Sequence, residues 1–284
     1  MDQSIVAKKN KVPGSVSQLG TIAKYEFKNY FGSRRFYILL TIALLVSALL
    51  TAVVGYYRPT SFLANELGFY SSWWGNSVTF VIILSGIFFG GDAISGEFQN
   101  KTGYYLIPNP VRRSSIYVGK WLSAFAASAI IIAIFMGLTV ANGMYYFGAS
   151  VPYEFVESAV FAFIYLAAVL GFTFLFSSLF KSSTSSILLT AILFLFVFSL
   201  VQTLVASLVQ VEPWFMLTYG AQIIGNVLKV PYPENVVTTR LPGPGGFTLT
   251  SYNATVPEGL ALMLVYCAVT AVLGLMLFER KDFT

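Results

Sequence analysis

The chain has 284 residues, of which 56% are hydrophobic and 10% charged, and its formal net charge is +5. Because a soluble domain carries roughly 25% charged residues, this composition excludes a single soluble core and indicates that lipid is part of the solvent. The absence of histidine and the single cysteine, Cys267, exclude an intrachain disulfide and argue against a zinc enzyme or a Ser-His-Asp hydrolase.

The first 33 residues precede the first long apolar run. We expect residues 1–16 to form a flexible tail, and nothing before Phe36 resembles the apolar core of a signal peptide, so the N-terminus is expected to be retained. Residues 17–33 have the period of an amphipathic helix, which suits the inner membrane surface. The alternative is an ordinary helix packed on a soluble partner. The apolar side consists of Leu19, Ile22, Ala23, Phe27, Tyr30 and Phe31.

Two residues of this interfacial helix are candidates for specific contacts. Glu26 lies within the apolar side, where a carboxylate is costly unless a cation or a hydrogen-bond donor meets it. We therefore expect Glu26 to contact another segment or another subunit. Phe27 lies in the same stripe and is expected to bury most of its ring, whereas Lys28 points to the polar side.

Six stretches are long and apolar enough to cross a bilayer, whose core of about 30 Å requires roughly 20 helical residues. They lie at about 36–57, 73–95, 118–147, 156–180, 186–210 and 259–278. The sequence therefore predicts an all-α membrane protein in which residues 1–284 form a single domain with six transmembrane helices.

The connection between the second and third spans contains the densest cluster of charge in the chain, "GEFQNKTGYYLIPNPVRRSSIYVGKW" over residues 96–121. Phe98 shares one helical face with Ile94 and Tyr105, and Pro108 and Pro110 stop any further helix. This pattern predicts a short helix at the membrane surface with one face available to a cytoplasmic protein.

Three cations of this connection are predicted to anchor the start of the third span at the lipid headgroups: Arg112, Arg113 and Lys120. A plain loop with an excess of positive charge is the alternative. It explains the cations but leaves a helix-sized insert closed by two prolines unexplained.

The orientation in the membrane follows from the distribution of lysine and arginine. With the N-terminus inside, the inner segments hold 14 of the 17 cations and the outer segments hold three. The inner cations are Lys8, Lys9, Lys11, Lys24, Lys28, Arg34, Arg35, Lys101, Arg112, Arg113, Lys120, Lys181, Arg280 and Lys281, and the outer ones are Arg58, Lys229 and Arg240. We therefore expect both termini in the cytoplasm, and contact with anionic lipid rather than with nucleic acid.

Three polar residues lie within the predicted spans: Asn76 in the second, Asn142 in the third and Gln202 in the fifth. With the assigned orientation, all three fall in the outer half of the bilayer. One interpretation is hydrogen bonding between helices. The other is a polar patch on an otherwise apolar translocation path, and the many Phe and Tyr residues suit an amphipathic or lipid-like cargo.

Residues 211–257 form an enlarged outer loop between the fifth and sixth spans. A short helix is expected to begin at Pro213 and to lie on the outer leaflet or dip into it. Its apolar stripe would comprise Trp214, Leu217, Ala221, Ile224 and Leu228. The remainder is rich in Pro and Gly and predicts an ordered loop without long helices. Asn253 begins an N-glycosylation sequence, Asn-Ala-Thr.

The order of several short motifs resembles one family. Glu97 and Gly103 in "EFQNKTG", "PVRR" from Pro110, and "GK" from Gly119 are similar to the Glu, Gly, Pro-x-x-Arg and Gly-Lys series of the ABC-2 family of ABC-transporter permeases. The ending "FERKDFT" resembles the family's Phe-plus-basic-plus-Asp finish. The chain departs from the family at Tyr104, where a Gly-Thr-Leu-like run is usual.

The resemblance implies the membrane subunit of an ABC exporter in the cell membrane. Two permeases, either two copies or this chain with a paralogue, would pair around a central path above two cytoplasmic ABC ATPase subunits. Residues 96–113 would be the main coupling element, with Glu97, Phe98, Gly103, Pro110, Arg112, Arg113 and Lys120 at or beside it. The turn "FKSSTSS" over residues 180–186, which contains Lys181, would be a smaller one.

ATP hydrolysis is expected in a separate polypeptide. No G-x-x-x-x-G-K-[ST] sequence occurs in the chain, so ATP and Mg would bind to the partner and no cofactor, metal or catalytic residue is expected here. Two alternatives remain open: a secondary transporter, which would usually need acidic or basic residues at bilayer depth, and a non-transporting scaffold or receptor for a cytoplasmic partner. An intramembrane enzyme is disfavoured, because the chain has no histidine and no buried acidic pair.

Overall fold

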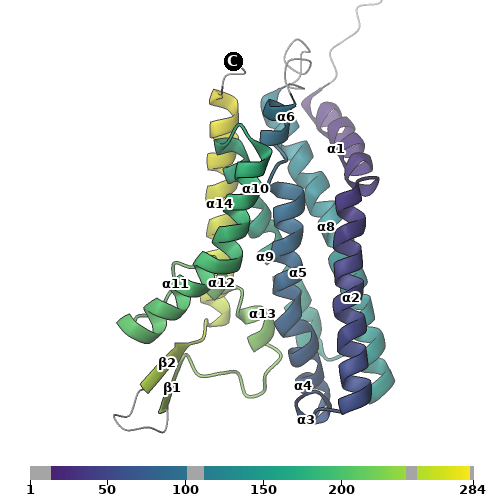
Figure 1. The fold of residues 1–284 in the computed structure, drawn as a ribbon, viewed down its shortest axis with the longest axis vertical. Helices are drawn as coiled ribbons and strands as arrows, with labels where there is room; N and C mark the ends of the chain where they lie inside the picture. The colour runs from purple at the N-terminus through teal and green to yellow at the C-terminus, as the bar shows by residue number, and fades with distance from the viewer. Residues whose placement is uncertain (1–13, 101–111, 241–247, 282–284) are drawn as a thin grey trace, which may run out of the picture.

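The computed structural model describes residues 14–100, 112–240 and 248–281, which form an elongated helical bundle (Figure 1). Six of its helical segments are long and apolar enough to cross a membrane. They are Arg34–Tyr57, Glu66–Gln99, Arg113–Phe147, Tyr153–Leu179, Ser183–Val209 and Val256–Arg280. The prediction of a helical membrane protein with six spans is therefore confirmed.

The spans are built from the following elements in chain order. The α-helices are α1 (Ser15–Phe31), α2 (Arg34–Tyr57), α3 (Thr60–Leu63), α4 (Glu66–Tyr70), α5 (Asn76–Gly90), α6 (Ser95–Gln99), α8 (Arg113–Phe147), α9 (Tyr153–Leu179), α10 (Ser183–Ile192), α11 (Phe198–Leu204), α12 (Leu217–Gly220), α13 (Ile223–Asn226) and α14 (Val256–Arg280). Short π-helical turns are η1 (Ser71–Gly75), η2 (Leu193–Val197) and η3 (Val205–Val209), and the strands β1 (Val236–Arg240) and β2 (Thr248–Tyr252) pair antiparallel.

The two ends of the bundle differ in what they carry (Figure 1). The terminal end, as we name it, holds α1, α6 and the last turn of α14. The hairpin end holds α3, α4, α12, α13 and the two strands. The functional residues predicted from the sequence divide between these two ends.

Four spans agree with their predicted bounds to within one helical turn, but the second and third begin earlier than predicted. The side-chain oxygen of Asn65 accepts a hydrogen bond from the Gly68 N–H at 2.6 Å and so starts the second span at α4. The π-turn η1 then carries this span into α5 without a break. The third span begins at Arg113, because the two serines that follow do not interrupt the helix.

α9 is the central helix of the bundle. It packs against α5, α14, α8 and α13. From Ala168 to Phe174 every residue is buried, whereas Tyr153, Val156 and Val160 near the start of the helix are exposed. An aromatic cluster fills the core near the hairpin end, where the Tyr70 ring centroid lies 4.5 Å from that of Phe155 and the Trp74 centroid 5.4 Å from it. By contrast, only 6% of the apolar stretch of the fifth span is buried, against 67% for the fourth. Figure 1 shows α11 diverging from the other helices.

The interfacial helix predicted over residues 17–33 is α1, which begins earlier and ends at Phe31. Ser15 and Val16, predicted as tail, form its first turn, and the rest of the predicted tail up to residue 13 lies outside the described residues. The apolar side of α1 packs along α8, so most of the stripe faces protein rather than lipid. Phe31 remains 46% exposed, and Phe27, which stacks on it with ring centroids 6.1 Å apart, is only partly buried.

The helix predicted from Pro213 is wrong in its start and in its surroundings. Two single-turn helices, α12 and α13, replace it, and the first begins at Leu217. The predicted stripe is buried against α9, α14 and η1, with Leu217 and Ile224 fully inaccessible, whereas Trp214 is 66% exposed. This segment therefore packs inside the protein and does not lie on the outer leaflet. The β-hairpin of β1 and β2 was not predicted, because the alternating pattern of "VVTTR" and "TLTSY" is short and polar.

Candidate functional sites at the two ends of the bundle

The helix α6 at the terminal end contacts four other elements and is linked to a fifth. It lies where the second span leaves the bundle, between α10 and α1 in the view of Figure 1. Its residues reach α8, α9, α10 and α14, and a shared cation links it to α1. Helix α6 is therefore the point at which these segments are joined.

A buried lysine joins three of these elements through ion pairs. Lys120 of α8 has a side chain that is 6% exposed, and its Nζ lies 2.7 Å from Glu26 Oε1 of α1 and 2.7 Å from Glu97 Oε1 of α6. We call Glu26, Lys120 and Glu97 the charge triad. The cation that the buried position of Glu26 requires is thus Lys120. Without it, two carboxylates would face each other in a poorly hydrated place.

Close backbone approach brings α1 onto α8 at this level. A Cβ atom on Gly119 would lie 2.9 Å from Cγ2 of Ile22, so only glycine leaves room for α1. One turn further on, the Ser123 hydroxyl donates to the carbonyl of Ala23 at 2.7 Å. The "GK" motif therefore has two roles here: its glycine admits the helix and its lysine pairs with that helix.

A second ion pair lies beside the triad. Arg35 of α2 contacts Asp92, just after α5, with Nη1 and Oδ1 2.6 Å apart. Between the two pairs, the buried Tyr30 hydroxyl donates to the Phe89 carbonyl at 3.2 Å, and burial raises the pKa of Tyr30, which keeps the hydroxyl neutral. A pocket of about 580 Å³ lies among these residues. The polar groups thus line one hollow at the terminal end.

Helix α6 is also tied to the fourth and fifth spans. The Ser177 hydroxyl oxygen of α9 accepts hydrogen bonds at 2.9 Å from the N–H groups of Ile94 and Ser95, which open α6. At its other end, Gln99 Oε1 accepts from the Ser183 N–H at 2.7 Å, at the start of α10. These bonds satisfy backbone donors that helix starts leave free, so α6 and α10 each depend on a neighbour for their first turn.

The C-terminal end of α14 completes this assembly. The Lys281 Nζ lies 4.4 Å from the ring centroid of Phe98 and donates to the carbonyls of Ser178 and Phe180, at 2.8 and 2.7 Å, where α9 ends. Burial lowers the pKa of Lys281 to about 8, and the charge of Lys181 acts in the same direction. Below that pH the ammonium is charged and suits the negative end of the α9 dipole.

The predicted coupling residues fall into three groups. Glu97 and Phe98 belong to the assembly around α6, whereas Gly103 and Pro110 lie outside the described residues. Arg112 and Lys181 are exposed at the terminal end. The predicted headgroup anchoring is wrong for Lys120, which is buried in the triad.

Arg113 also has a different environment from the one predicted. Its guanidinium donates to the carbonyls of Glu279 and Lys281 at 2.8 and 3.0 Å, and so caps the last turn of α14. The guanidinium is therefore held by protein carbonyls rather than by lipid headgroups, which corrects the prediction for this residue as well. The C-terminal end of the sixth span is fastened to the start of the third.

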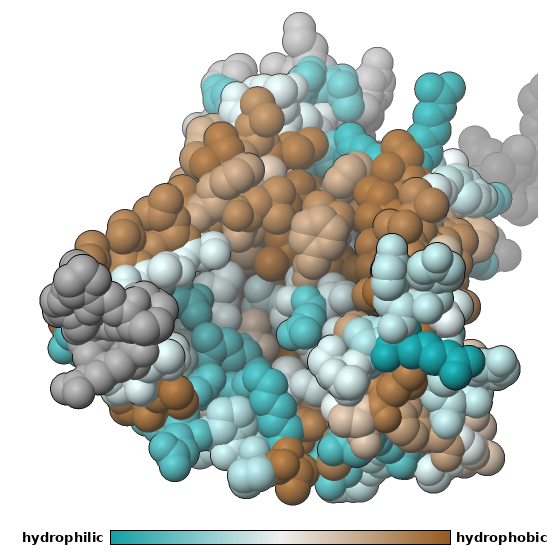
Figure 2. All heavy atoms as spheres, turned by 60° about the horizontal axis from the view of Figure 1, so that its bottom comes forward, coloured by the Kyte–Doolittle hydropathy of each residue, from teal (hydrophilic) through white to brown (hydrophobic). Residues whose placement is uncertain are grey.

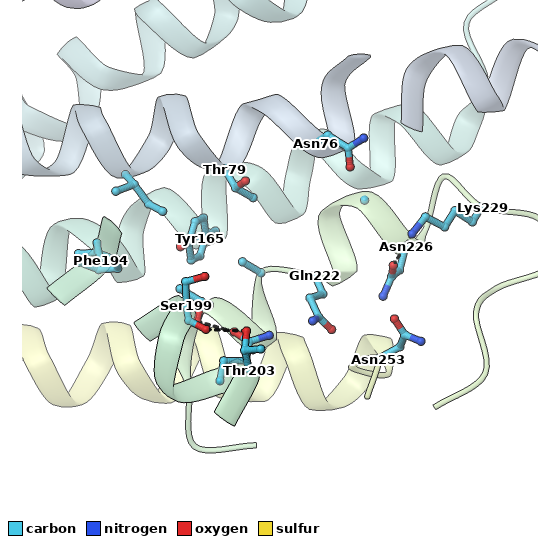
Figure 3. A pocket seen from close by; sticks show the side chains of 16 residues that line it. Asn76, Thr79, Tyr165, Phe194, Ser199, Thr203, Gln222, Asn226, Lys229 and Asn253 are labelled. Atoms are coloured by element: carbon cyan, nitrogen blue, oxygen red, sulfur yellow. Dashed lines mark hydrogen bonds between the residues drawn. The ribbon is translucent and has the colours of Figure 1, made fainter. Parts of the chain in front are cut away.

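The hairpin end contains a second candidate site, a pocket of about 470 Å³ that we call the hairpin-end pocket. Figure 2 shows hydrophilic side chains gathered around a hollow in this face, beneath more hydrophobic flanks. The pocket is lined by Gly75, Asn76, Thr79, Ile83, Tyr165, Phe194, Ser199, Gln202, Thr203, Thr218, Ala221, Gln222, Gly225, Asn226, Lys229 and Asn253 (Figure 3). A Cβ on Gly75 would lie 2.9 Å from the Gly225 Cα, so two glycines bring η1 and α13 together at its edge.

The structure brings two of the three predicted path residues to this pocket. Asn76 and Gln202 line it from the second and fifth spans. Asn142 does not: its Oδ1 accepts from the Thr51 hydroxyl at 3.2 Å, between α8 and α2. Asn253 lines the pocket as well, and its Nδ2 donates to the Glu234 carbonyl at 2.8 Å. A glycan on Asn253 would replace one of the two hydrogens of that Nδ2 atom.

Several residues of both sites were not predicted. At the terminal end these are Asp92 as the partner of Arg35, Ser177 and Gln99; at the hairpin end they are Gln222 and Asn226. Ser177 and Ser178 interrupt an apolar run, which was a usable signal for Ser177, but its partners are distant in sequence. Among the described residues, no group of three His, Cys, Asp or Glu side chains could hold a metal ion.

Comparison with known protein families identifies the family of the chain. The family model described as ABC-2 family transporter protein matches residues 20–283, which covers all six spans and both candidate sites. A search of curated proteins finds no match.

Proposed function

The chain belongs to the ABC-2 family of transporter proteins, and on that premise we propose that it is the permease subunit of an ATP-driven exporter. In this proposal it hydrolyses no ATP itself. Two permeases, this chain with a second copy or a paralogue, form the translocation path, and two separate ABC ATPase subunits bind ATP and Mg beneath them. The assembly lies in the cell membrane with both termini in the cytoplasm.

The observation that carries the proposal is the assembly around α6. The segment that follows α6 has the proline-bounded, basic composition of a docking element. Helix α6 itself contacts α8, α9, α10 and α14 and is linked to α1 through Lys120. A displacement of this segment by a closing ATPase is therefore transmitted as a rigid-body movement to several spans at once. A simple positively charged loop would have no need of these bonds.

The coupling role is tested by replacing Glu97 with alanine and, separately, Gly103 with proline in the full transporter. The Glu97 variant loses one arm of the charge triad, so we expect normal membrane insertion but reduced co-purification of the ATPase, or ATP hydrolysis that no longer drives export. Glu279→Ala is the matched control, because it removes an exposed carboxylate at the same end. Wild-type transport and cargo-stimulated hydrolysis in both test variants would refute the assignment of this segment.

The orientation is a separate prediction that rests on the charge distribution, 14 cations against three. In a Cys267→Ala background, single cysteines at Ser4 and Thr284 are expected to resist membrane-impermeant thiol reagents in intact cells. A cysteine at Thr250, in β2 at the hairpin end, should react. Labelling of either terminus in sealed cells would reverse the orientation, and with it the identification of the terminal end as the cytoplasmic one.

A further inference from the structure

Two amide side chains of the hairpin-end pocket have oxygen atoms that are already engaged. Gln222 Oε1 accepts from the backbone N–H of Ala254 at 3.2 Å, and Asn226 Oδ1 accepts from Lys229 Nζ at 3.2 Å (Figure 3). A backbone N–H and an ammonium group can only donate, so these partners fix which way each amide is turned. Both residues therefore leave an NH₂ group for the pocket.

Of these two NH₂ groups, that of Asn226 is the more deeply buried. The residue is 4% exposed, and its Nδ2 atom makes no hydrogen bond of normal geometry among the described residues; its polar neighbour is the Tyr232 hydroxyl. Gln202 adds a third amide, whose Oε1 accepts from the Thr218 hydroxyl at 2.8 Å. A buried NH₂ group has two hydrogens to satisfy, and a ligand that supplies acceptor atoms would complete its hydrogen bonding.

The charge of the lining agrees with such a ligand. Lys229 is the single cation among the residues that line the pocket in the described part of the chain, and no lining residue is acidic. Asn253 and Asn76 differ from the other amides, because their Nδ2 atoms donate to the carbonyls of Glu234 and Ser72, and their Oδ1 atoms are left to accept. The lining thus combines Lys229 and the amide NH₂ groups beside it with these two amide oxygens, which suits an anionic group rich in oxygen atoms next to a hydroxyl or N–H.

The two ends of the pocket differ in polarity. Figure 3 shows Asn226, Lys229 and Asn253 at one end and Phe194 with Tyr165 at the other. At about 470 Å³ the cavity is much larger than a phosphate group, so most of the ligand would lie beside the aromatic end. From these contacts we infer that the pocket binds a phosphate-bearing amphiphile, with the phosphate at Gln222, Asn226 and Lys229. The further identification of this amphiphile as cargo rests on the proposed function, whereas its binding does not.

Binding is to be measured at equilibrium on the purified full-length protein in an uncharged maltoside detergent, without any ATPase. The probes are lysophosphatidic acid, the monoacylglycerol with the same acyl chain, and glycerol 3-phosphate. We expect lysophosphatidic acid to bind at least about tenfold more tightly than either of the others. Because no ATPase is present, a failure of ATP coupling leaves this result unchanged, so the two proposals fail separately.

The decisive variant is Gln222→Glu, which retains an oxygen for the Ala254 N–H and replaces the free NH₂ with a negative oxygen. We expect it to weaken lysophosphatidic acid binding at least about tenfold, and Lys229→Gln, at an exposed position, to do the same. Gln99→Glu is the matched control, since Gln99 Oε1 likewise accepts from a backbone N–H but lies at the terminal end; its binding should equal that of the wild type.

Three outcomes would overturn the inference. Equal binding of the monoacylglycerol would show that the phosphate is not recognised. Equally tight binding of glycerol 3-phosphate would show that the ligand is a soluble phosphate compound and not an amphiphile. Unchanged binding in both Gln222→Glu and Lys229→Gln would place the ligand elsewhere on the protein.

Discussion

Replacing Lys120 with methionine is expected to lower the free energy of unfolding by about 3–5 kcal/mol, the usual effect of removing one partner from a buried ion pair. Methionine keeps the length of the side chain but leaves the carboxylates of Glu26 and Glu97 without their cation. Since both carboxylates lie within 2.7 Å of Lys120 Nζ, they would repel each other and separate α1 and α6 from α8. We expect a lower apparent melting temperature in detergent and faster proteolysis of α1.

A variant in which all three triad residues are neutral distinguishes the contribution of charge to stability from that of packing. In the triple variant Lys120→Met, Glu26→Gln and Glu97→Gln, no charge is left unpaired, so most of the lost stability should return. Lys24→Met removes an exposed cation from α1 and should leave the melting temperature unchanged, as expected for a surface charge. If Lys120→Met melts like the wild type, the triad contributes nothing to the joining of α1, α6 and α8. If the triple variant is as unstable as the single one, the loss is one of packing.

The second large effect is expected at Gly171, where α9 and α14 approach closely. A Cβ at this position would lie 2.6 Å from Thr270 Oγ1 and 3.3 Å from the Cys267 carbonyl oxygen. The Cys267 carbonyl oxygen belongs to the backbone of α14, so it can move away only if the whole helix shifts. Gly171→Leu should therefore push α14 away from the central helix and cost about 3 kcal/mol or more.

Gly137 supplies the matched control for this substitution. It also lies within a spanning helix, α8, but a Cβ there would meet nothing within 4 Å. Gly137→Leu should be neutral or slightly stabilising, because leucine is the better helix former by about 0.8 kcal/mol. The measurement is the apparent melting temperature together with the monodisperse yield of the full-length protein. Equal values for the two variants would mean that α14 is not held by close contact with α9.

The contacts that join α14 to the rest of the bundle also affect how a movement of α6 would be transmitted to the spans. Arg113 caps α14, and Lys281 binds the last carbonyls of α9 and the ring of Phe98. In the proposed exporter, a displacement of α6 would therefore reach the fourth and sixth spans directly, and the third span and the interfacial helix α1 through the charge triad. The fifth span is bound to α6 at its start through Gln99 and diverges from the other helices at its far end (Figure 1).

The sequence by itself determined the number of spans and the distribution of charge, because the length of an apolar run and the positions of lysine and arginine are local properties. It also indicated that Glu26 needed a cation or a hydrogen-bond donor. It could not name that cation, since Lys120 is 94 positions away in the chain and a lysine at the start of a span is equally typical of a headgroup anchor.

The tertiary structure alone decided which face of each span is buried. Helices such as α9 are apolar all round, so their sequence carries no period that distinguishes protein from lipid. For the same reason Leu217 and Ile224 were assigned to the leaflet, although they pack on α9, α14 and η1. The hairpin-end pocket likewise exists only where the second, fourth and fifth spans meet α12 and α13, and no local pattern records that meeting.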